Sequence, residues 1–194
     1  MANIELHKVA RTSDGQEITC LNVVARELRG NQMIFKNLAG EASEFNQRGD
    51  RVFSIKFEDP ETIAAIREGG YNIVDKVYID KETGDEVPYS ALKVKINLEP
   101  KFDSQVPHIY IVKNDIMTQV WPGTTKEAVD SLQTARLRSF DVELDPSPWV
   151  YGKKKGVTAY VKNLVMFIDE VPTSEFMNNY AKYSQDVHDD DIPF

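Results

Sequence analysis

Two stretches of strictly alternating residues limit what this chain can fold into. In residues 92–98 every second residue is aliphatic, and the positions between them hold two lysines and an asparagine. In residues 51–57 a phenylalanine or an isoleucine occupies every second position after Arg51. Successive side chains of a strand point to opposite faces, so a period of two predicts half-buried β-strands. Lys93 and Lys95 then lie on a solvent-facing surface.

Shorter β-like runs and turns fill most of the remaining chain. The run 18–24 continues into residues 25–28, which could equally be helical. Residues 46–49 look like a hairpin turn before the strand that starts at Arg51. The segment 145–148, with its two prolines, is expected to end a strand. Strands are also expected over residues 4–9, 18–24, 33–38, 71–79, 108–112, 140–144 and 157–168.

Helix signals occur at three places. Asp59 before Pro60 is a typical N-cap and first helical residue, and a glycine pair follows nine residues later. Thr124 is followed three residues later by a glutamate, which is a capping box and predicts a helix over residues 125–136. A third short helix is expected over residues 173–183. Short strands with two or three short helices suit an all-β or β-rich α+β fold, a small antiparallel barrel with inserted helices.

Length and composition favour a single domain. The chain has 194 residues, 41% of them hydrophobic, which is enough to bury a core. We expect residues 1–183 to form that domain, with residues 1–32 as an extension whose structure the sequence does not specify. Residues 184–194 are expected to form a flexible acidic tail. No apolar run approaches the roughly 20 residues of a membrane span, and the first residues lack the features of a secretory signal, so we expect a cytoplasmic protein.

The residues that usually carry catalysis or bind metals are sparse. Cys20 is the only cysteine, and the three histidines are scattered, so neither a disulfide nor a zinc site is expected. The sequence contains no phosphate loop, dinucleotide-binding, serine-hydrolase or metalloprotease motif. We therefore expect no catalysis, no metal and no cofactor. A metal-dependent nuclease built from distant carboxylates is the weakest alternative.

A local basic and aromatic segment points to nucleic acid. The formal net charge is -8, so any such site must be a local groove and not a general basic surface. Residues 146–168 contain no acid but four lysines, a tryptophan and two tyrosines. Gly152 and Gly156 bracket three of the lysines, as at a hairpin tip. Cations that follow phosphates and rings on which bases stack are what non-specific single-strand binders need.

Each of these features also has a plain structural interpretation. Three lysines at a hairpin tip are commonly a solvated turn, and Trp149 beside two prolines could be packed in the core. Tyr160 could cover the edge of a barrel. The clustering of the features favours DNA binding. The candidate DNA-binding residues are Lys36, Phe45, Asn46, Arg48, Arg51, Lys56, Lys93, Lys95, Trp149, Tyr151, Lys153, Lys154, Lys155, Tyr160 and Lys162.

The last residues form a second motif. Asp189, Asp190 and Asp191 are followed by Ile192, Pro193 and Phe194. Carboxylates can steer the segment toward a basic surface, where an aromatic side chain fills a pocket. This ending resembles the C-terminal tip of bacterial single-stranded DNA-binding proteins. The resemblance implies that the six residues recruit host or phage replication and repair proteins.

The body resembles a family of bacteriophage single-stranded DNA-binding proteins. The resemblance lies in residues 37–40, 45–53, 70–73, 148–152 and 156–162. It implies an OB-fold, a five-stranded antiparallel barrel that binds single strands without sequence specificity during replication, recombination or repair in the cytoplasm of a bacterial host.

Two features of the bacterial housekeeping protein are absent from the chain. Its opening motifs are missing, which leaves a homo-oligomer possible, and so is its long linker before the tip, which limits the reach of the tail. The alternative function is an OB-fold adaptor or replisome accessory protein that mainly binds protein.

Overall fold

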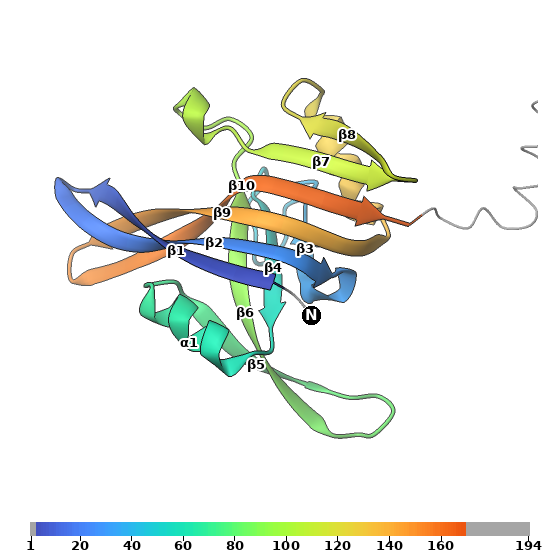
Figure 1. The fold of residues 1–194 in the computed structure, drawn as a ribbon, viewed down its shortest axis with the longest axis horizontal. Helices are drawn as coiled ribbons and strands as arrows, with labels where there is room; N and C mark the ends of the chain where they lie inside the picture. The colour runs from blue at the N-terminus through green and yellow to red at the C-terminus, as the bar shows by residue number, and fades with distance from the viewer. Residues whose placement is uncertain (1–2, 170–194) are drawn as a thin grey trace, which may run out of the picture.

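The computed structural model describes residues 3–169, and in this range ten strands join one mixed sheet (Figure 1). The strands are β1 (Asn3–Ser13), β2 (Gln16–Arg29), β3 (Met33–Asn37), β4 (Arg51–Phe57), β5 (Ile73–Ile79), β6 (Glu86–Ile96), β7 (His108–Lys113), β8 (Ile116–Trp121), β9 (Leu137–Tyr151) and β10 (Lys154–Ile168). The helices are α1 (Pro60–Glu68) and α2 (Lys126–Asp130), with 3-10 turns η1 (Gly30–Gln32), η2 (Asp103–Gln105) and η3 (Ser131–Thr134). The expected strand-rich class is confirmed.

The sheet follows the order β1-β2-β9-β10-β6-β4-β3. β10 is its central strand, because it pairs with β9 along one edge and with both β6 and β7 along the other. β5 pairs with the first half of β6, and β7 carries β8 as an outer strand. The β5–β6 and β9–β10 hairpins diverge from the body, one downward and one to the left in Figure 1.

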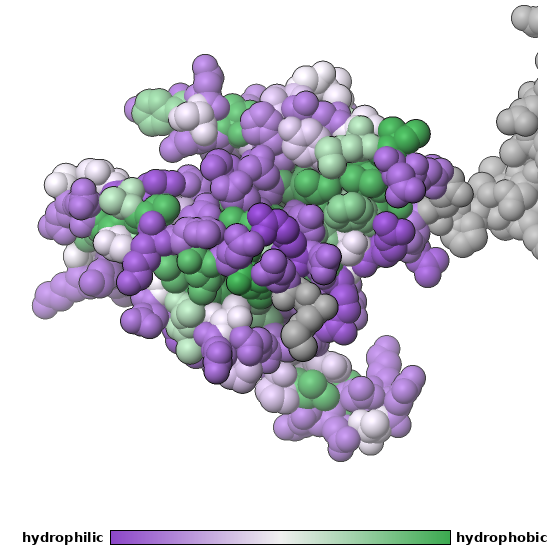
Figure 2. Space-filling view, viewed as in Figure 1, coloured by the Kyte–Doolittle hydropathy of each residue, from purple (hydrophilic) through white to green (hydrophobic). Residues whose placement is uncertain are grey.

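Alternation along the strands builds the core. Phe53, Ile55 and Phe57 of β4 are all buried, as their spacing predicts. The ring of Phe53 meets that of Phe140 on β9 edge to face, with centroids 6.4 Å apart. Hydrophilic side chains cover most of the face of the molecule in Figure 2, with apolar patches between them. One strand face is therefore inside, and the other is available for contacts.

The expected five antiparallel strands differ from the ten that are present. β6 and β7 both run parallel to β10. β9 and β10 have 15 residues each, longer than any strand expected from the sequence. β9 runs through the segment 145–148, where a strand end was expected. Pro146 and Pro148 are tolerated because β2 pairs with β9 only as far as Leu144, so beyond it β9 has β10 as its only strand partner.

The helix expected over residues 125–136 is also shorter. It consists of α2 and η3 and ends at Thr134. The N-cap is Thr125, which makes no side-chain cap. Thr124 lies before the cap, and its hydroxyl donates to the carbonyl of Val120. The expected capping box at Thr124 is therefore wrong.

Two further expectations concern the start of α1 and the end of β2. α1 begins as expected, with the Asp59 carboxylate accepting a hydrogen bond of 2.8 Å from the Thr62 amide. Residues 25–28 belong to β2, which settles their assignment in favour of strand. The helix expected over 173–183 and the tail over 184–194 lie outside the described residues.

Candidate nucleic-acid interface

The outer face of β4 and β6 carries exposed cations. Because Leu92, Val94 and Ile96 point into the core, Lys93 and Lys95 of β6 point outward and are exposed. On β4, Ser54 and Val52 lie opposite these two lysines in the pairing register. Both residues are uncharged, so no acid of β4 lies opposite the cations.

The loop between β3 and β4, residues 38–50, reaches this face. Phe45 at its tip is 80% exposed. The Lys93 ammonium donates a hydrogen bond of 3.5 Å to the side-chain oxygen of Asn46. Two tight turns lie in this loop: Ser43 and Asn46 form an isolated bridge, and the turn expected at 46–49 lies one residue later, where the Asp50 amide donates 3.0 Å to the Gln47 carbonyl. The first turn carries Phe45 and Asn46. This turn brings an aromatic ring, an amide and a lysine together at one end of the face.

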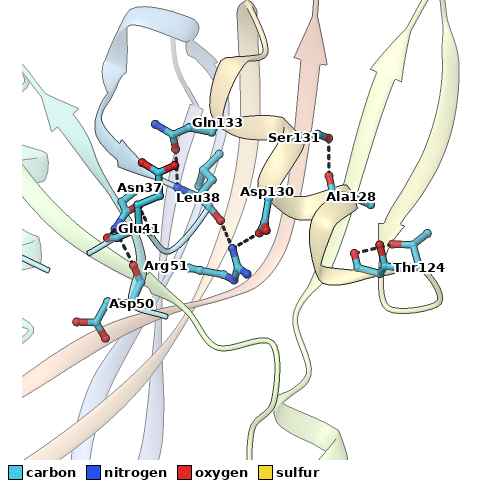
Figure 3. Close-up of polar contacts among 11 residues, drawn as sticks. Asn37, Leu38, Glu41, Asp50, Arg51, Thr124, Ala128, Asp130, Ser131 and Gln133 are labelled. Atoms are coloured by element: carbon cyan, nitrogen blue, oxygen red, sulfur yellow. Dashed lines mark hydrogen bonds and ion pairs between the residues drawn. The ribbon is translucent and has the colours of Figure 1, made fainter. Parts of the chain in front are cut away.

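Exposed and partly buried polar contacts hold the base of the loop in place (Figure 3). The Asn37 amide donates to the carbonyls of Glu41 and Asp50 at 2.9 and 3.0 Å. The Arg51 guanidinium donates to the carbonyl of Leu38 and pairs with Asp130 at 2.5 Å. The Arg51 side chain is only 11% exposed. These contacts give Arg51 an anchoring position between the loop and α2.

Gln133 and Lys36 belong to the same anchor. Gln133 accepts from the backbone amide of Leu38 and donates to the carbonyl of Lys36. The Lys36 ammonium lies 3.4 Å from the carbonyl oxygen of Ala135, and burial lowers the pKa of this lysine. Arg48 is exposed and lines a pocket of about 700 Å³ between the loop and α2. Of the cations expected in this region, Arg48 is thus the exposed one.

β10 meets the cationic face at Tyr160. This residue is the register partner of Lys95, so the two lie side by side where β10 crosses β6. Its partner on β9 is Asp145, which is paired with Arg11 at 2.5 Å. A cleft of about 510 Å³ lies beside Tyr160 and is also lined by Arg11, Lys101 and Lys162.

Acidic side chains bound this surface on the β9 side. Asp141, Glu143 and Asp145 alternate along β9 and share its outer face. Lys162 is engaged there, because its ammonium lies 2.9 Å from a Glu143 carboxylate oxygen. Asp145 is likewise paired with Arg11, which leaves Asp141 as the acid of this row that forms no ion pair in the described part of the chain.

The β9–β10 hairpin carries the remaining candidates. Trp149 is 42% exposed and Tyr151 is 82% exposed, and the three lysines 153–155 are exposed. The turn lies at Gly152 and Lys153, between the paired residues Tyr151 and Lys154. Gly156 is not at the tip, as had been expected, but inside β10.

Gly156 is the register partner of Trp149, and the indole lies against it. A Cβ on Gly156 would be 2.6 Å from Cζ2 of Trp149. The lack of a side chain at this position lets the ring pack against β10 at Gly156 with part of its surface exposed.

Four further residues on the same outer face, Phe35, Lys76, Tyr78 and Tyr89, are absent from the candidates named from the sequence. The Lys56 ammonium lies 4.7 Å from the ring centre of Tyr78 and 5.4 Å from that of Tyr89. The Lys76 ammonium lies 4.6 Å from the ring centre of Phe35. The alternation of Val74, Lys76 and Tyr78 on β5 was the available signal, but the pairing of β5 with β6 was needed to place it.

The structure thus brings part of the expected set together. Asn46, Lys93, Lys95 and Tyr160 form one continuous surface, and Lys56 lies further along it. The β9–β10 tip begins about six residues before Tyr160 on β10, which corresponds to about 20 Å. Arg51, Lys36 and Lys162 have protein partners. Among residues 3–169 no group of three or more acids, histidines or cysteines is placed to hold a metal, and no helix there is long and apolar enough to cross a membrane.

Comparison with known proteins decides the family. The model of a family described as "Putative phage ssDNA-binding domain" matches residues 18–191. The chain belongs to this family. The matched range of this phage ssDNA-binding domain begins within β2 and contains every candidate DNA-binding residue from Lys36 to Lys162. Neither the comparison with curated proteins nor that with solved structures found a significant match.

Proposed function

We propose that this protein binds single-stranded DNA without sequence specificity during replication, recombination or repair of phage DNA in a bacterial cell. The observation that carries the proposal is the surface formed by Asn46, Lys93, Lys95 and Tyr160. It offers cations and a ring on one sheet face and is bounded by acids on β9. Cations follow the phosphates and rings stack on bases whatever their sequence. We assign no catalysis and no cofactor to this surface.

We further propose that the strands around this surface form an OB-type barrel. The sheet order places β2 and β3 at distant positions of its path, yet only η1 separates them along the chain. Treated as one bent strand, β2 and β3 are followed by β4, β6, β9 and β10, and pairings link these five in a ring. The β1, β5, β7 and β8 strands are then additions to the barrel.

This assignment agrees with where OB-folds bind oligonucleotides. They use the face of the second and third strands, between the loop joining strands one and two and the loop joining strands four and five. Here those elements are the outer face of β4 and β6, the loop 38–50 and the β9–β10 tip. Phe45, Asn46, Lys93 and Trp149 lie on these elements.

The first test is a direct measurement of strand preference. Fluorescence anisotropy with labelled oligo-dT and with a duplex of equal length should show tighter binding of the single strand. Equal affinity for both would refute the DNA proposal. An absence of binding to either would favour the adaptor function, in which the barrel binds protein.

A second test uses single lysines. Lys93→Gln and Lys95→Gln should each weaken oligo-dT binding and reduce the slope of log K against log salt by about 0.7, the value for one lost phosphate contact. Lys113→Gln removes an exposed lysine from β7, away from the proposed surface, and serves as the control. If all three variants lower the slope equally, binding depends on the overall charge of the protein and not on this face.

For residues 189–194 we propose a recruiting role, which rests on the sequence motif. Three carboxylates followed by an isoleucine, a proline and a phenylalanine combine long-range steering with apolar anchors. We propose the same division for the whole chain, a DNA-binding domain over residues 1–183 and a tail over 184–194.

A further inference from the structure

The β5–β6 ribbon extends the outer face of β4 and β6 away from the body of the molecule (Figure 1). Val74, Lys76 and Tyr78 share a face with Tyr89 and Lys93, because β5 pairs with β6 in register over Ile73–Ile79. Tyr89 and Lys93 are four residues apart on β6, which corresponds to about 13 Å. The ribbon is therefore a continuation of the proposed DNA-binding face.

Three aromatic rings and two lysines that lie over them form a cluster on this continuation. We call Phe35, Lys56, Lys76, Tyr78 and Tyr89 the ribbon cluster. Phe35 is 59% exposed and Tyr78 is 40% exposed, so large parts of both rings face solvent. Exposed aromatic surface beside an ammonium group provides both interactions that one nucleotide requires, a stacking face for the base and a cation for the phosphate.

The backbone at Phe35 supports a role for this ring. Phe35 has a φ of +52° and lies where the pairing of β3 with β4 shifts register, between Ile34 and Asn37. A bulge of this kind re-aims a side chain, and a positive φ is unfavourable for a residue with a Cβ. Burial does not compensate for this cost, because the ring is mainly exposed. The bulge instead holds the ring in solvent, where a base can stack on it.

The charges of the cluster also suit an anion. Lys76 forms no ion pair with any residue of the range 3–169, whereas Lys56 lies 3.1 Å from the Glu58 carboxylate. Glu58 in turn pairs with Arg29 at 3.1 Å, so cations outnumber carboxylates in this group. Lys76 is thus the cation of the cluster that is free to meet a phosphate.

We propose that the ribbon cluster is a second base-stacking site, in which Phe35 and Tyr78 stack on unpaired bases and Lys76 contacts the backbone phosphate. This second site rests on the proposed function and extends the proposed DNA-binding surface. A single strand then runs along β6, past Lys95 and Lys93, onto the β5–β6 ribbon. The ligand class is an extended single strand, since paired bases do not present their faces.

The test compares variants of Phe35 in the full chain with oligo-dT of increasing length. Phe35→Leu should lower affinity for long oligo-dT by about 5- to 150-fold, the range found for loss of one stacked base. Phe35→Tyr should bind like the parent. For the parent and Phe35→Tyr, affinity should go on rising with length beyond the point at which Phe35→Leu levels off.

Phe35→Gly separates stacking from folding. Glycine adopts a φ of +52° without strain, so this variant should unfold at an equal or higher temperature than the parent while binding as weakly as Phe35→Leu. Val77→Thr is the matched control, because Val77 is 57% exposed on the opposite face of the same ribbon. It should leave affinity unchanged.

The outcomes distinguish this site from the proposed function. If the parent prefers single strands and both Phe35→Leu and Phe35→Gly bind long oligo-dT as it does, the ribbon site is refuted and the proposed function stands. A loss in Val77→Thr equal to that in Phe35→Leu also refutes the site, because the ribbon as a whole would then be responsible. If the parent shows no preference for single strands, both proposals fail.

Discussion

At the scale of single residues, Gly156 determines how the Trp149 indole, the more exposed of the two, packs on the hairpin. Trp149 lies over Gly156, and neither its neighbouring prolines nor the lysines nearby make that contact. A glycine inside a strand normally weakens it, because the backbone loses more freedom on folding and no side chain packs. Here the missing side chain makes room for a ring that is 42% exposed. The packing of Trp149 on Gly156 can be measured as a coupling free energy between the two residues.

We expect Gly156→Ala to displace the Trp149 ring. The new Cβ would lie 2.6 Å from Cζ2, so the free energy of unfolding should fall by about 1–3 kcal/mol, as for overpacked sites. In a Trp149→Ala background the same substitution should raise it by roughly 0.5–1 kcal/mol, because the clash is gone and alanine is better than glycine in a strand. Denaturant unfolding of the four proteins measures this cycle. An equal effect of Gly156→Ala in both backgrounds contradicts the packing described.

At the scale of elements, the β3–β4 loop depends on α2 for its position. Asn37 and Gln133 hold its backbone, and the ion pair of Arg51 with Asp130 joins it to the helix (Figure 3). Loops that carry binding residues are usually positioned by a rigid scaffold in this way. We therefore expect the charge of Arg51 to act through the placement of the loop that carries Phe45, and not through a direct DNA contact.

Arg51→Met and Asp130→Asn test that division of roles. Each should lower the free energy of unfolding by about 1–3 kcal/mol, because a partly buried charged hydrogen bond is lost. Both should weaken oligo-dT binding, since both loosen the loop. If Arg51 acted on DNA by charge alone, Asp130→Asn would instead tighten binding by removing a negative charge. Anisotropy titrations with the two variants decide between the alternatives.

The contact of Glu143 on β9 with Lys162 and Asn163 on β10 makes the stability of the fold depend on pH. Burial acts to raise the pKa of the Glu143 carboxyl, but hydrogen bonds from Lys162 at 2.9 Å and Asn163 at 2.6 Å outweigh it, and the pKa lies below its ordinary value of 4.5. A group whose pKa is lowered by folding stabilises the fold above that ordinary value, and the contribution is lost as the pH falls through the folded value.

Glu143→Gln should therefore lower the free energy of unfolding by about 1 kcal/mol near neutral pH. Below pH 4.5 the difference between parent and variant should shrink, because the parent carboxylate becomes protonated. Glu86→Gln removes an exposed acid that forms no ion pair in the described part of the chain, and it is the control. Thermal unfolding from pH 3 to pH 7 measures both, and a difference that does not change with pH contradicts the assignment.

At the scale of the whole molecule, charge is divided between regions. The chain carries a formal net charge of -8, yet the outer face of β4 and β6 holds Lys93 and Lys95 with uncharged β4 residues opposite them. Acids gather on β9 and in residues 189–191. Local and not total charge sets the affinity for a phosphate chain. The outer face of β4 and β6 is therefore the surface that we propose for a polyanion.

Removal of residues 192–194 tests the proposed tail. Oligo-dT binding should stay unchanged, because Ile192, Pro193 and Phe194 are not among the proposed DNA contacts and the three aspartates remain. Affinity capture from a bacterial lysate should lose the replication and repair proteins that the full chain retains, and Phe194→Ala should reproduce much of that loss. Retention of the same proteins by the truncated chain, or a weaker hold on oligo-dT, contradicts the recruiting role.

Local patterns in the sequence determined much of the secondary structure of this protein and the direction of several side chains. The alternation in residues 51–57 and 92–98 predicts both strands and the outward direction of Lys93 and Lys95, and Asp59 before Pro60 predicts the start of α1. These features depend on neighbours in the sequence, so they are readable without coordinates. The family resemblance of the body is likewise confirmed by the match over residues 18–191.

Tertiary structure decided everything that depends on which strands become neighbours. Tyr160 meets Lys95 only because β10 runs parallel to β6, and Lys76 meets Phe35 only through a bulge in β3 and the pairing of β5 with β6. Arg51 is a candidate DNA contact by sequence, and its ion pair with Asp130 and its 11% exposure are visible only in the structure. Such contacts join residues far apart in the sequence, 79 positions for Arg51 and Asp130 and 134 for Arg11 and Asp145. Long-range pairing follows from the packing of the complete sheet, and a period of two in one strand carries no information about its partner.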